Sequence, residues 1–390
     1  MASGTCAPSS LLPSDAGLAA AQAHGGDRLL MGPGPSNLYP EVRAALSLPL
    51  LGHLDPEFLA ILDETNALLR SVMRTANQLT FPLSGTGSAG MEAALVNLLE
   101  PGDVAVVGVN GLFGERMREV AQRCGAEVIG VEAPWGEPLD PERLVAAHPA
   151  PKVIALVHAE TSTGVRNDVA QVAAAKGDAL VVADTVTSLG GIAVDTDAWG
   201  VDVAYGATQK CLGVPPGLAP ITVSDRARAR MVQRPRSWYL DLGLIAGYVD
   251  GGSTAGGRVY HHTAPVTMVR ALHAGLGVLA DEGLEQVWAR HAGNGERLLS
   301  GLEALGFVSI AAAGHRLPQL ACVTWPDGLL APFGSEGEIR ARLLRDYGIE
   351  IGGGVGRLAG KVWRIGCMGH GARRANVTLV LAALAEVLGR

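Results

Sequence analysis

Short apolar runs alternate with amphipathic stretches along this chain, and the alternation restricts the fold more than any other feature. The runs are Val-rich and apolar throughout, which is typical of strands buried on both faces of a sheet. The expected strands are Val104–Val109, Glu127–Val131, Val153–His158, Ala179–Ala183, Val201–Tyr205 and Pro220–Val223, and the expected helices lie near Ser88–Leu99, Leu112–Cys124, Asp140–Ala147 and Val169–Lys176. This order predicts an α/β fold with a mostly parallel sheet flanked by helices.

The length of 390 residues predicts more than one domain. Residues 1–27 are rich in Ala, Ser, Gly and Pro without lasting periodicity, which is typical of a flexible tail. A long helical stretch, roughly 265–306, is interrupted near Gly283. We therefore expect an N-terminal arm over residues 1–27, a large domain over 28–283 and a smaller α+β domain over 284–390.

Charge and cysteine usage exclude several classes of protein. The net charge of −7 provides no basic face for nucleic acid or an anionic membrane. No apolar run reaches the roughly 18 residues of a membrane span, and the first 14 residues contain no Lys or Arg for a secretory signal. The five cysteines are scattered without C-x-x-C spacing, so neither a disulfide framework nor a zinc or other metal site is indicated. We expect a cytoplasmic protein.

The run Ala179–Ala183 ends in a single acid, Asp184, and Lys210 follows later in a turn rich in Gly and Pro. An acid at the end of such a strand faces a ligand crevice more often than solvent. The chain has only four lysines among 31 Lys and Arg residues, so a lysine retained in an uncharged loop is notable. A loop of this kind permits a lowered lysine pKa and covalent chemistry, although composition alone favours a solvated surface lysine.

The segment Gly85–Gly90 fits the pattern G-x-G-x-x-G. In a dinucleotide-binding fold the next strand should end in an acid that binds the ribose, but here it is followed by Asn110. A phosphate needs only the start of a helix, where the amides of Thr86, Gly87 and Ser88 and the helix dipole suit an anion. The sequence favours a phosphate cup, with a dinucleotide site or a structural turn as alternatives.

Eight short motifs follow one order along the chain. They are GPGPSN at 32–37, SGTGSAGMEAAL at 84–95, NGLFG at 110–114, HAETSTG at 158–164, ADTVTSLGG at 183–191, GATQK at 206–210, YHHT at 260–263 and WRIG at 363–366. Together they resemble fold type I pyridoxal-phosphate enzymes of class V, and most closely the alanine–glyoxylate and serine–pyruvate aminotransferase family. The resemblance implies a seven-stranded, mostly parallel sheet in the large domain and pyridoxal 5'-phosphate as cofactor.

The resemblance implies a role for each motif at the cofactor. Lys210 would hold the cofactor covalently and carry the substrate proton, and Asp184 would pair with the ring nitrogen, unless that acid caps a helix. The remaining contacts would be phosphate binding by Gln209, a hydroxyl contact from Thr161, and packing of Phe113 and Val186 on the two ring faces. Phe113 could instead be an ordinary core aromatic. His158 and Glu160 are interpreted as structural rather than as an acid/base pair.

Further motifs concern the substrate and a second subunit. Arg364 lies in an apolar strand, where a guanidinium is costly to bury unless it is paired. It would bind the substrate α-carboxylate together with the loop at Gly32, the alternative being a structural ion pair. The resemblance places Tyr260 and Thr263 at the phosphate of the neighbouring subunit, which implies a homodimer with shared active sites. A plain loop pair is the alternative, and the N-terminal arm would lie over the partner.

The implied activity is transfer of an amino group from alanine or serine to glyoxylate or pyruvate by a ping-pong mechanism. One clear carboxylate-binding arginine favours small neutral side chains over acidic ones. The alternatives are a ureidoglycine- or phosphonate-type aminotransferase, a desulfurase-like lyase, an NAD-dependent oxidoreductase, or a binding protein without catalysis. Cys322, inside a strand, and Cys367, just past one, do not suit the mobile nucleophile of a desulfurase, and Lys210 with Asp184 argues against lost catalysis.

Overall fold

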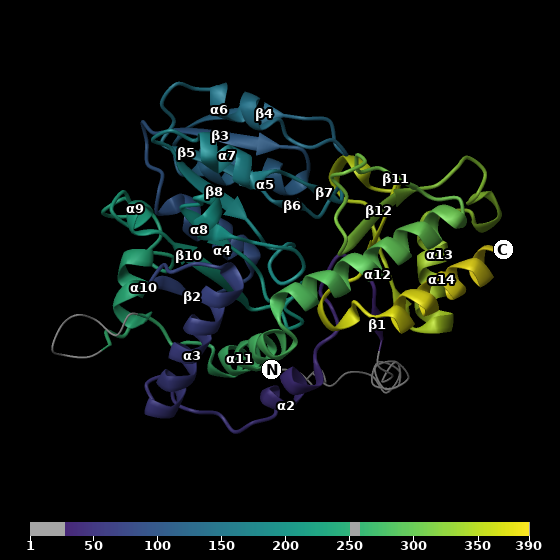
Figure 1. Ribbon diagram of the computed structural model, residues 1–390, viewed down its shortest axis with the longest axis horizontal. Coiled ribbons are helices and arrows are strands. Elements are labelled where there is room, and N and C mark those ends of the chain that lie inside the picture. The colour runs from purple at the N-terminus through teal and green to yellow at the C-terminus, as the bar shows by residue number, and fades with distance from the viewer. Residues whose placement is uncertain (1–27, 250–257, 390) are drawn as a thin grey trace, which may run out of the picture.

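The computed structural model describes residues 28–249 and 258–389, and the arm expected over residues 1–27 lies outside these ranges. Two sheets, each with its own helices, form two adjoining bodies (Figure 1). Within the described residues, no helix combines the length and apolarity that a membrane crossing requires. The same residues contain no cluster of three His, Cys, Asp or Glu side chains suited to a metal ion.

The central sheet has seven strands in the order β2-β10-β9-β8-β5-β3-β4. They are β2 (Leu79–Ser84), β3 (Val104–Val109), β4 (Glu127–Glu132), β5 (Val153–Val157), β8 (Leu180–Asp184), β9 (Val203–Tyr205) and β10 (Leu218–Val223). All neighbours pair in parallel except β10, which is antiparallel to both β2 and β9. The predicted mostly parallel, seven-stranded sheet is confirmed. Its parallel strands place their carboxyl ends at one edge, and β8 contributes Asp184 there.

Helices cover the sheet on both faces (Figure 1). The helices of this body are α2 (Pro40–Leu46), α3 (Pro56–Met73), α4 (Gly87–Val96), α5 (Leu112–Arg123), α6 (Pro141–Ala146), α7 (Val169–Ala175), α8 (Thr196–Trp199), α9 (Asp225–Arg228), α10 (Leu242–Val249) and α11 (Val266–Glu282). Of these, α11 packs on α2 and α3 rather than on the sheet (Figure 1). Local chemistry sets several of their starts. Asp55 caps α3 and Asp140 caps α6 through backbone amides, with Pro as the first helical residue in both.

The second body is built on a four-stranded antiparallel sheet, β11 (Val308–Ser309), β12 (Leu320–Thr324), β15 (Trp363–Gly366) and β14 (Gly352–Gly353), in that order. The helices α12 (Leu284–Ala304), α13 (Glu336–Tyr347) and α14 (Arg374–Leu388) pack with it around a separate core that includes Trp363. The short strand β1 (Leu29–Leu30) pairs with β13 (Ile349–Glu350), so Met31 belongs to this second core. The long helical stretch is two helices divided at Gly283, which has a φ of 83°. The domain division at this residue stays a prediction.

Candidate active site

A cavity of about 140 Å³ opens at the carboxyl edge of the central sheet, where β5 and β8 end. It is lined by Thr86, Gly87, Ser88, Met91, Phe113, Arg116, Val157, Ala159, Thr161, Asp184, Val186, Gln209 and Lys210. Every residue predicted to contact the cofactor from within one subunit belongs to this set. The fold therefore brings together side chains that the sequence separates by more than a hundred positions.

Asp184 is the last residue of β8 and is only 3% exposed. Its Oδ1 accepts a hydrogen bond from the Val186 amide at 2.9 Å, and its Oδ2 accepts one from the Tyr205 hydroxyl at 2.9 Å. Burial raises the pKa of Asp184 to about 7, although both hydrogen bonds act to lower it. Val186 lies in a turn and starts no helix, so Asp184 is not a helix cap. Its carboxylate is oriented for a cation brought into the cavity, and such a cation would lower this pKa.

Lys210 lies in the turn after Gln209, and its side chain is buried rather than solvated at the surface. Its Nζ donates a hydrogen bond to the carbonyl of Pro33. Burial lowers the pKa of Lys210 to about 8, and the positive charge of Arg364 acts in the same direction. A large fraction of this amine is neutral near pH 8, which is the form that attacks a carbonyl.

The helix α4 starts at the cavity, and its N-cap, Thr86, makes no side-chain capping bond. The amides of Gly87 and Ser88 are therefore available to an anion. Gly87 lets the turn that carries Val186 pack closely against the start of α4, because a Cβ atom at position 87 would lie only 2.7 Å from Cγ2 of Val186. The buried Oε1 of Gln209 has no hydrogen-bond partner among the described residues. The start of α4 suits a phosphate group, whereas the Oε1 of Gln209 is an acceptor that a donor of the ligand would satisfy.

Phe113 and Val186 line the cavity from α5 and from the turn after β8, and both are half-buried. The guanidinium carbon of Arg116 lies 5.1 Å from the centroid of the Phe113 ring. Arg116 also donates to Oγ of Ser88 at 3.2 Å. The sequence prediction omitted Arg116, although residues three apart on a helix share a face, and this spacing was the available signal.

A two-stranded hairpin, β6 (Ala159–Glu160) and β7 (Val165–Arg166), follows β5. Glu160 is fully buried, and its carboxylate accepts from the amides of Gly114 at 3.2 Å and Ser162 at 3.0 Å. It thus ties the start of α5 to the hairpin that carries Thr161, whose hydroxyl bonds that of Thr187. Burial raises the pKa of Glu160. The carboxylate of Glu160 thus holds backbone segments together, as expected for a structural residue.

His158 does not line this cavity. Its ring packs edge-on against Trp199, with the centroids 5.1 Å apart. Among the described residues, no hydrogen bond joins His158 to Glu160, so the structure does not assemble them as an acid/base pair.

Arg364 lies in β15 and is 8% exposed. Its Nε donates to the carbonyl of Gly353 at 2.8 Å, and no carboxylate of the described ranges forms an ion pair with it. Burial lowers the pKa of Arg364. The adjoining loop is fixed by a bond from the Gly366 amide to the Met31 carbonyl at 2.7 Å, which places the buried Gly32 beside β15. The alternative of a structural ion pair for Arg364 is therefore not found among the described residues.

Tyr260 and Thr263 do not line the cavity of their own chain. Tyr260 is 57% exposed. Thr263 borders an open hollow of about 520 Å³ together with Ser84, Gly85 and Tyr239. Their contact with a partner's phosphate stays a prediction.

Comparison with known proteins shows the family. The model of the class-V aminotransferases matches residues 41–357. The chain belongs to the class-V aminotransferase family. This aminotransferase is 38% identical over 384 residues to the (S)-ureidoglycine–glyoxylate transaminase of Bacillus subtilis, covering 93% of this chain and 91% of that protein. It is 39% identical to the alanine–glyoxylate aminotransferase of Drosophila melanogaster, covering 93% and 92%. The crystal structure of an alanine–glyoxylate aminotransferase from Nostoc sp. matches with a TM-score of 0.86 and 46% identity, covering 93% of this chain and 96% of that one.

The cofactor of this aminotransferase is pyridoxal 5'-phosphate, and the lining of the cavity fits it. Asp184 suits the ring nitrogen, Lys210 provides a buried amine for the aldehyde, and the start of α4 suits the phosphate. The unpartnered Oε1 of Gln209 is a further group that a ligand can satisfy. The dinucleotide alternative lacks the ribose-binding acid that it requires, because β3 is followed by Asn110. The amide of Asn110, which follows β3, is bonded to Asn167 and to the Glu137 carbonyl.

The sequence prediction also missed Tyr205, Met91, Val157 and Ala159 at the site of the aminotransferase. For Tyr205 a signal existed, because this residue ends the predicted strand that follows the one ending in Asp184. In a parallel sheet the ends of neighbouring strands meet, and the structure pairs the two residues directly.

Proposed function

We propose that this aminotransferase moves an amino group from alanine or serine to glyoxylate or pyruvate by a ping-pong mechanism. The observation that carries the proposal is Arg364, a buried guanidinium without a carboxylate partner in the described chain. Its forked donors match the α-carboxylate that all four compounds share. The one arginine in the lining of the cofactor cavity, Arg116, bonds Ser88 at the phosphate end. Among the described residues, no other arginine lines that cavity, which supports small neutral substrates over acidic ones.

The bound cofactor supplies an electron sink for the pair released when the substrate Cα–H bond breaks. Asp184, held by Tyr205 and by the Val186 amide, keeps a negative charge beside the ring nitrogen. Lys210, whose pKa burial lowers to about 8, accepts the proton from the substrate Cα and returns it to the other end of the reacting system. Arg364 orients the substrate through its carboxylate, so that the Cα–H bond faces Lys210.

A homodimer with shared active sites is part of the proposal. Large apolar side chains are exposed in two segments, Leu48, Leu50 and Leu54 in one, and Trp238, Tyr239, Leu244, Val259 and Tyr260 in the other. The segments adjoin, because the ring of His53 packs on that of Tyr260 at 5.4 Å. Exposed apolar surface of this kind marks an interface, and a two-fold axis would use the same surface on both chains.

Subunit complementation tests the sharing. A Lys210→Ala chain and a chain carrying Tyr260→Ala with Thr263→Ala should each be poorly active as homodimers. If the sites are shared, mixing the two chains under subunit exchange should restore one intact site per mixed dimer and part of the activity. Absence of recovery despite exchange would place Tyr260 and Thr263 outside the partner's site.

A second candidate activity is transfer from ureidoglycine to glyoxylate, because the B. subtilis relative carries that name. A desulfurase-like lyase has little support, since burial raises the pKa of Cys322 and of Cys367 to about 12 and keeps both thiols protonated. The aminotransferase family also leaves the oxidoreductase alternative without support.

A spectral titration decides between the donors. The absorption band of the Lys210-bound cofactor should disappear on adding alanine or serine and return on adding glyoxylate or pyruvate. If only ureidoglycine removes the band, the second candidate is right. If neither small amino acid nor ureidoglycine removes it, both substrate assignments fail.

We also propose a cytoplasmic location. The four cysteines of the described ranges, Cys124, Cys211, Cys322 and Cys367, are all free thiols, as a reducing compartment favours. Fractionation of the source cells with an antibody against the chain tests this directly.

A further inference from the structure

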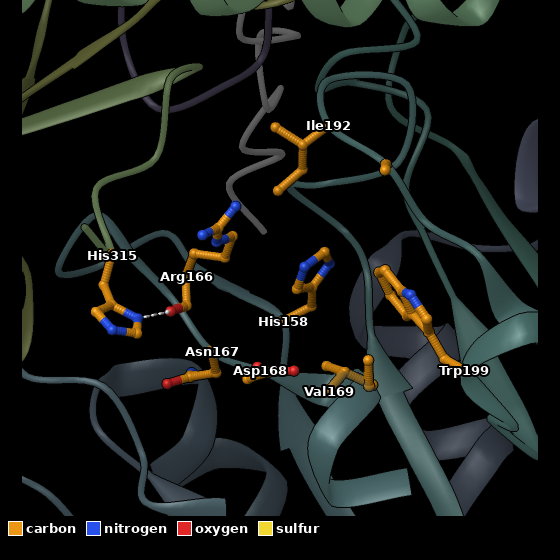
Figure 2. Close-up of a pocket in the computed structure, with 10 residues that line it drawn as sticks. His158, Arg166, Asn167, Asp168, Val169, Ile192, Trp199 and His315 are labelled. Carbon is orange, nitrogen blue, oxygen red and sulfur yellow. Dashed lines mark hydrogen bonds between the residues drawn. The ribbon is translucent and has the colours of Figure 1, made fainter. Parts of the chain in front are cut away.

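A second cavity, of about 290 Å³, lies beside the hairpin β6–β7 and shares no lining residue with the cofactor cavity. Figure 2 shows its walls, with the ring of His158 between Arg166 and Trp199 and with Ile192 on the far side. His315 reaches it from the segment before β12. The reaction proposed above makes no use of these residues.

His158 is the strongest sign that the cavity takes a ligand. The residue is 4% exposed, and its buried Nδ1 has no hydrogen-bond partner among the described residues. Burial lowers the pKa of His158 to about 3, so the ring is neutral and offers one N–H donor and one acceptor. A buried polar atom left without a partner is unfavourable, and a bound polar group would restore its hydrogen bond.

The walls carry one cationic side chain, Arg166, and one acidic side chain, Asp168. The guanidinium of Arg166 has one recorded contact in the described chain, to the Gly314 carbonyl at 3.4 Å, and it forms no ion pair there. The carboxylate of Asp168 accepts from the Gln171 amide at 2.9 Å at the start of α7, and no ion pair joins it to Arg166 in the described chain. The arginine fork therefore retains its capacity for a carboxylate, which it can bind with two parallel hydrogen bonds.

His315 adds a further polar atom on the same side. Its Nδ1 lies 3.1 Å from the Arg166 carbonyl, an acceptor, so Nδ1 carries the hydrogen. The amide of Arg166 donates to the His315 carbonyl at 2.7 Å, which fixes the two segments together. The Nε2 atom is the ring nitrogen that remains for a polar contact with a ligand or water.

The opposite wall is apolar and partly aromatic. Trp199 and Ile192 are half-buried, and Val169 closes the floor. An indole and a branched aliphatic side chain provide a surface for a flat or apolar body. The cavity therefore joins one cationic end, one apolar side and an unsatisfied imidazole.

We propose that this cavity is a second binding site, for a small carboxylic acid with a flat apolar body. The carboxylate pairs with Arg166, the body lies against Trp199 and Ile192, and a polar atom of the ligand or a trapped water satisfies His158. The site is independent of the substrate assignment at the cofactor cavity. It also adjoins the catalytic edge, because the His158 amide donates to the Asp184 carbonyl at 2.9 Å.

The test uses the full chain loaded with its cofactor and three probes with the same fluorophenyl body, namely 4-fluorobenzoate, 4-fluorobenzamide and 4-fluoro-N,N-dimethylbenzylamine, a tertiary amine that cannot form an imine with the cofactor. Binding is measured by ¹⁹F NMR. Because a carboxylate could also bind at Arg364, each titration is repeated in an Arg364→Gln background. Arg166→Gln removes the cationic end, Trp199→Leu removes the aromatic wall, and Arg123→Gln, an exposed arginine on α5, is the matched control.

We expect 4-fluorobenzoate to bind in the Arg364→Gln background, and the amide and amine to bind about tenfold more weakly or not at all. Arg166→Gln and Trp199→Leu should each weaken benzoate binding about tenfold, and Arg123→Gln should leave it unchanged. Unfolding curves identify any variant that is misfolded. If one of Arg166→Gln and Trp199→Leu fails to fold, the other still tests the site. Loss of binding in Arg364→Gln alone, equal binding of all three probes, stronger binding of the amine, or no binding up to about 10 mM would each overturn the proposal.

Discussion

The hydroxyl of Tyr205 donates a hydrogen bond to Oδ2 of Asp184 at 2.9 Å, and the two residues are register partners at the ends of β9 and β8. The Val186 amide occupies the other carboxylate oxygen at 2.9 Å. Both donors favour the ionised acid against the burial that raises the pKa of Asp184 to about 7. The charge that the cofactor nitrogen requires therefore depends on Tyr205 as well as on Asp184.

Replacing Tyr205 by Phe should lower kcat about tenfold, because Asp184 loses one of two donors and its pKa rises. A smaller fraction of the acid is then ionised at neutral pH, so the acidic limb of the kcat–pH profile should move to higher pH. The control is Tyr347→Phe, a half-buried tyrosine of α13 remote from the cavity. An unchanged pH profile in Tyr205→Phe would mean that the hydroxyl does not tune this carboxyl.

Loading of the apoprotein with pyridoxal phosphate should accelerate as the pH rises through about 8, because only the neutral amine of Lys210 attacks the aldehyde. The folded-state pKa of this lysine is lower than its ordinary value of 10.5, so the neutral fraction is large at a pH where an exposed lysine is still charged. Stopped-flow absorbance measures the rate. Lys210→Ala should abolish the covalent band and lower turnover by about 10²–10⁴, whereas Lys361→Ala, an exposed lysine, should change neither. A loading rate that rises only near pH 10 would contradict the lowered pKa.

Arg364→Gln should raise KM for both amino donor and 2-oxo acceptor about a hundredfold, because each loses a bidentate carboxylate contact of a few kcal/mol. The stability of the apoprotein should fall little or rise, since no carboxylate partner is stranded in the described chain. A structural ion pair would behave in the opposite way, because breaking one costs about 3–5 kcal/mol and leaves KM unchanged. Steady-state kinetics and urea unfolding on the same preparation separate the two outcomes.

The cofactor cavity was predictable because its key residues lie at points that local sequence marks. Two of these features can be recognised from a few neighbouring residues, namely the apolar run that ends in Asp184 and the isolated Lys210 in a Gly/Pro-rich turn. The glycine motif before α4 can be recognised in the same way. Motif order then supplied the family, and with it the seven-stranded sheet.

Other features depend on contacts between distant segments. The end of the strand at Tyr205 is marked in the sequence, but its pairing with Asp184 also requires the two strands to be neighbours in the sheet, which only the strand order decides. The hairpin β6–β7 has only two residues in each strand, too few for any periodic pattern. The second cavity needs the loop carrying His315 to meet Arg166 from 149 positions away. Such contacts follow from tertiary packing, which overrides local propensity.

Gly34 supplies the last prediction. It has a φ of 107°, and a Cβ atom there would lie 2.7 Å from Cδ and 2.8 Å from Nζ of Lys210. Gly34→Ala should therefore displace the lysine from the Pro33 carbonyl, slow cofactor loading at least tenfold and also destabilise the fold by about 1–2 kcal/mol through backbone strain.

The matched control is Gly328→Ala, where φ is 81° but a Cβ would meet nothing within 4 Å. It carries a similar strain without touching Lys210, so its unfolding curve should shift comparably while its loading rate stays at the wild-type value. The difference between the two variants isolates the steric contact with the amine from the backbone cost. Equal loading rates would show that the lysine side chain moves aside freely, and that the glycine is needed there only for its backbone conformation.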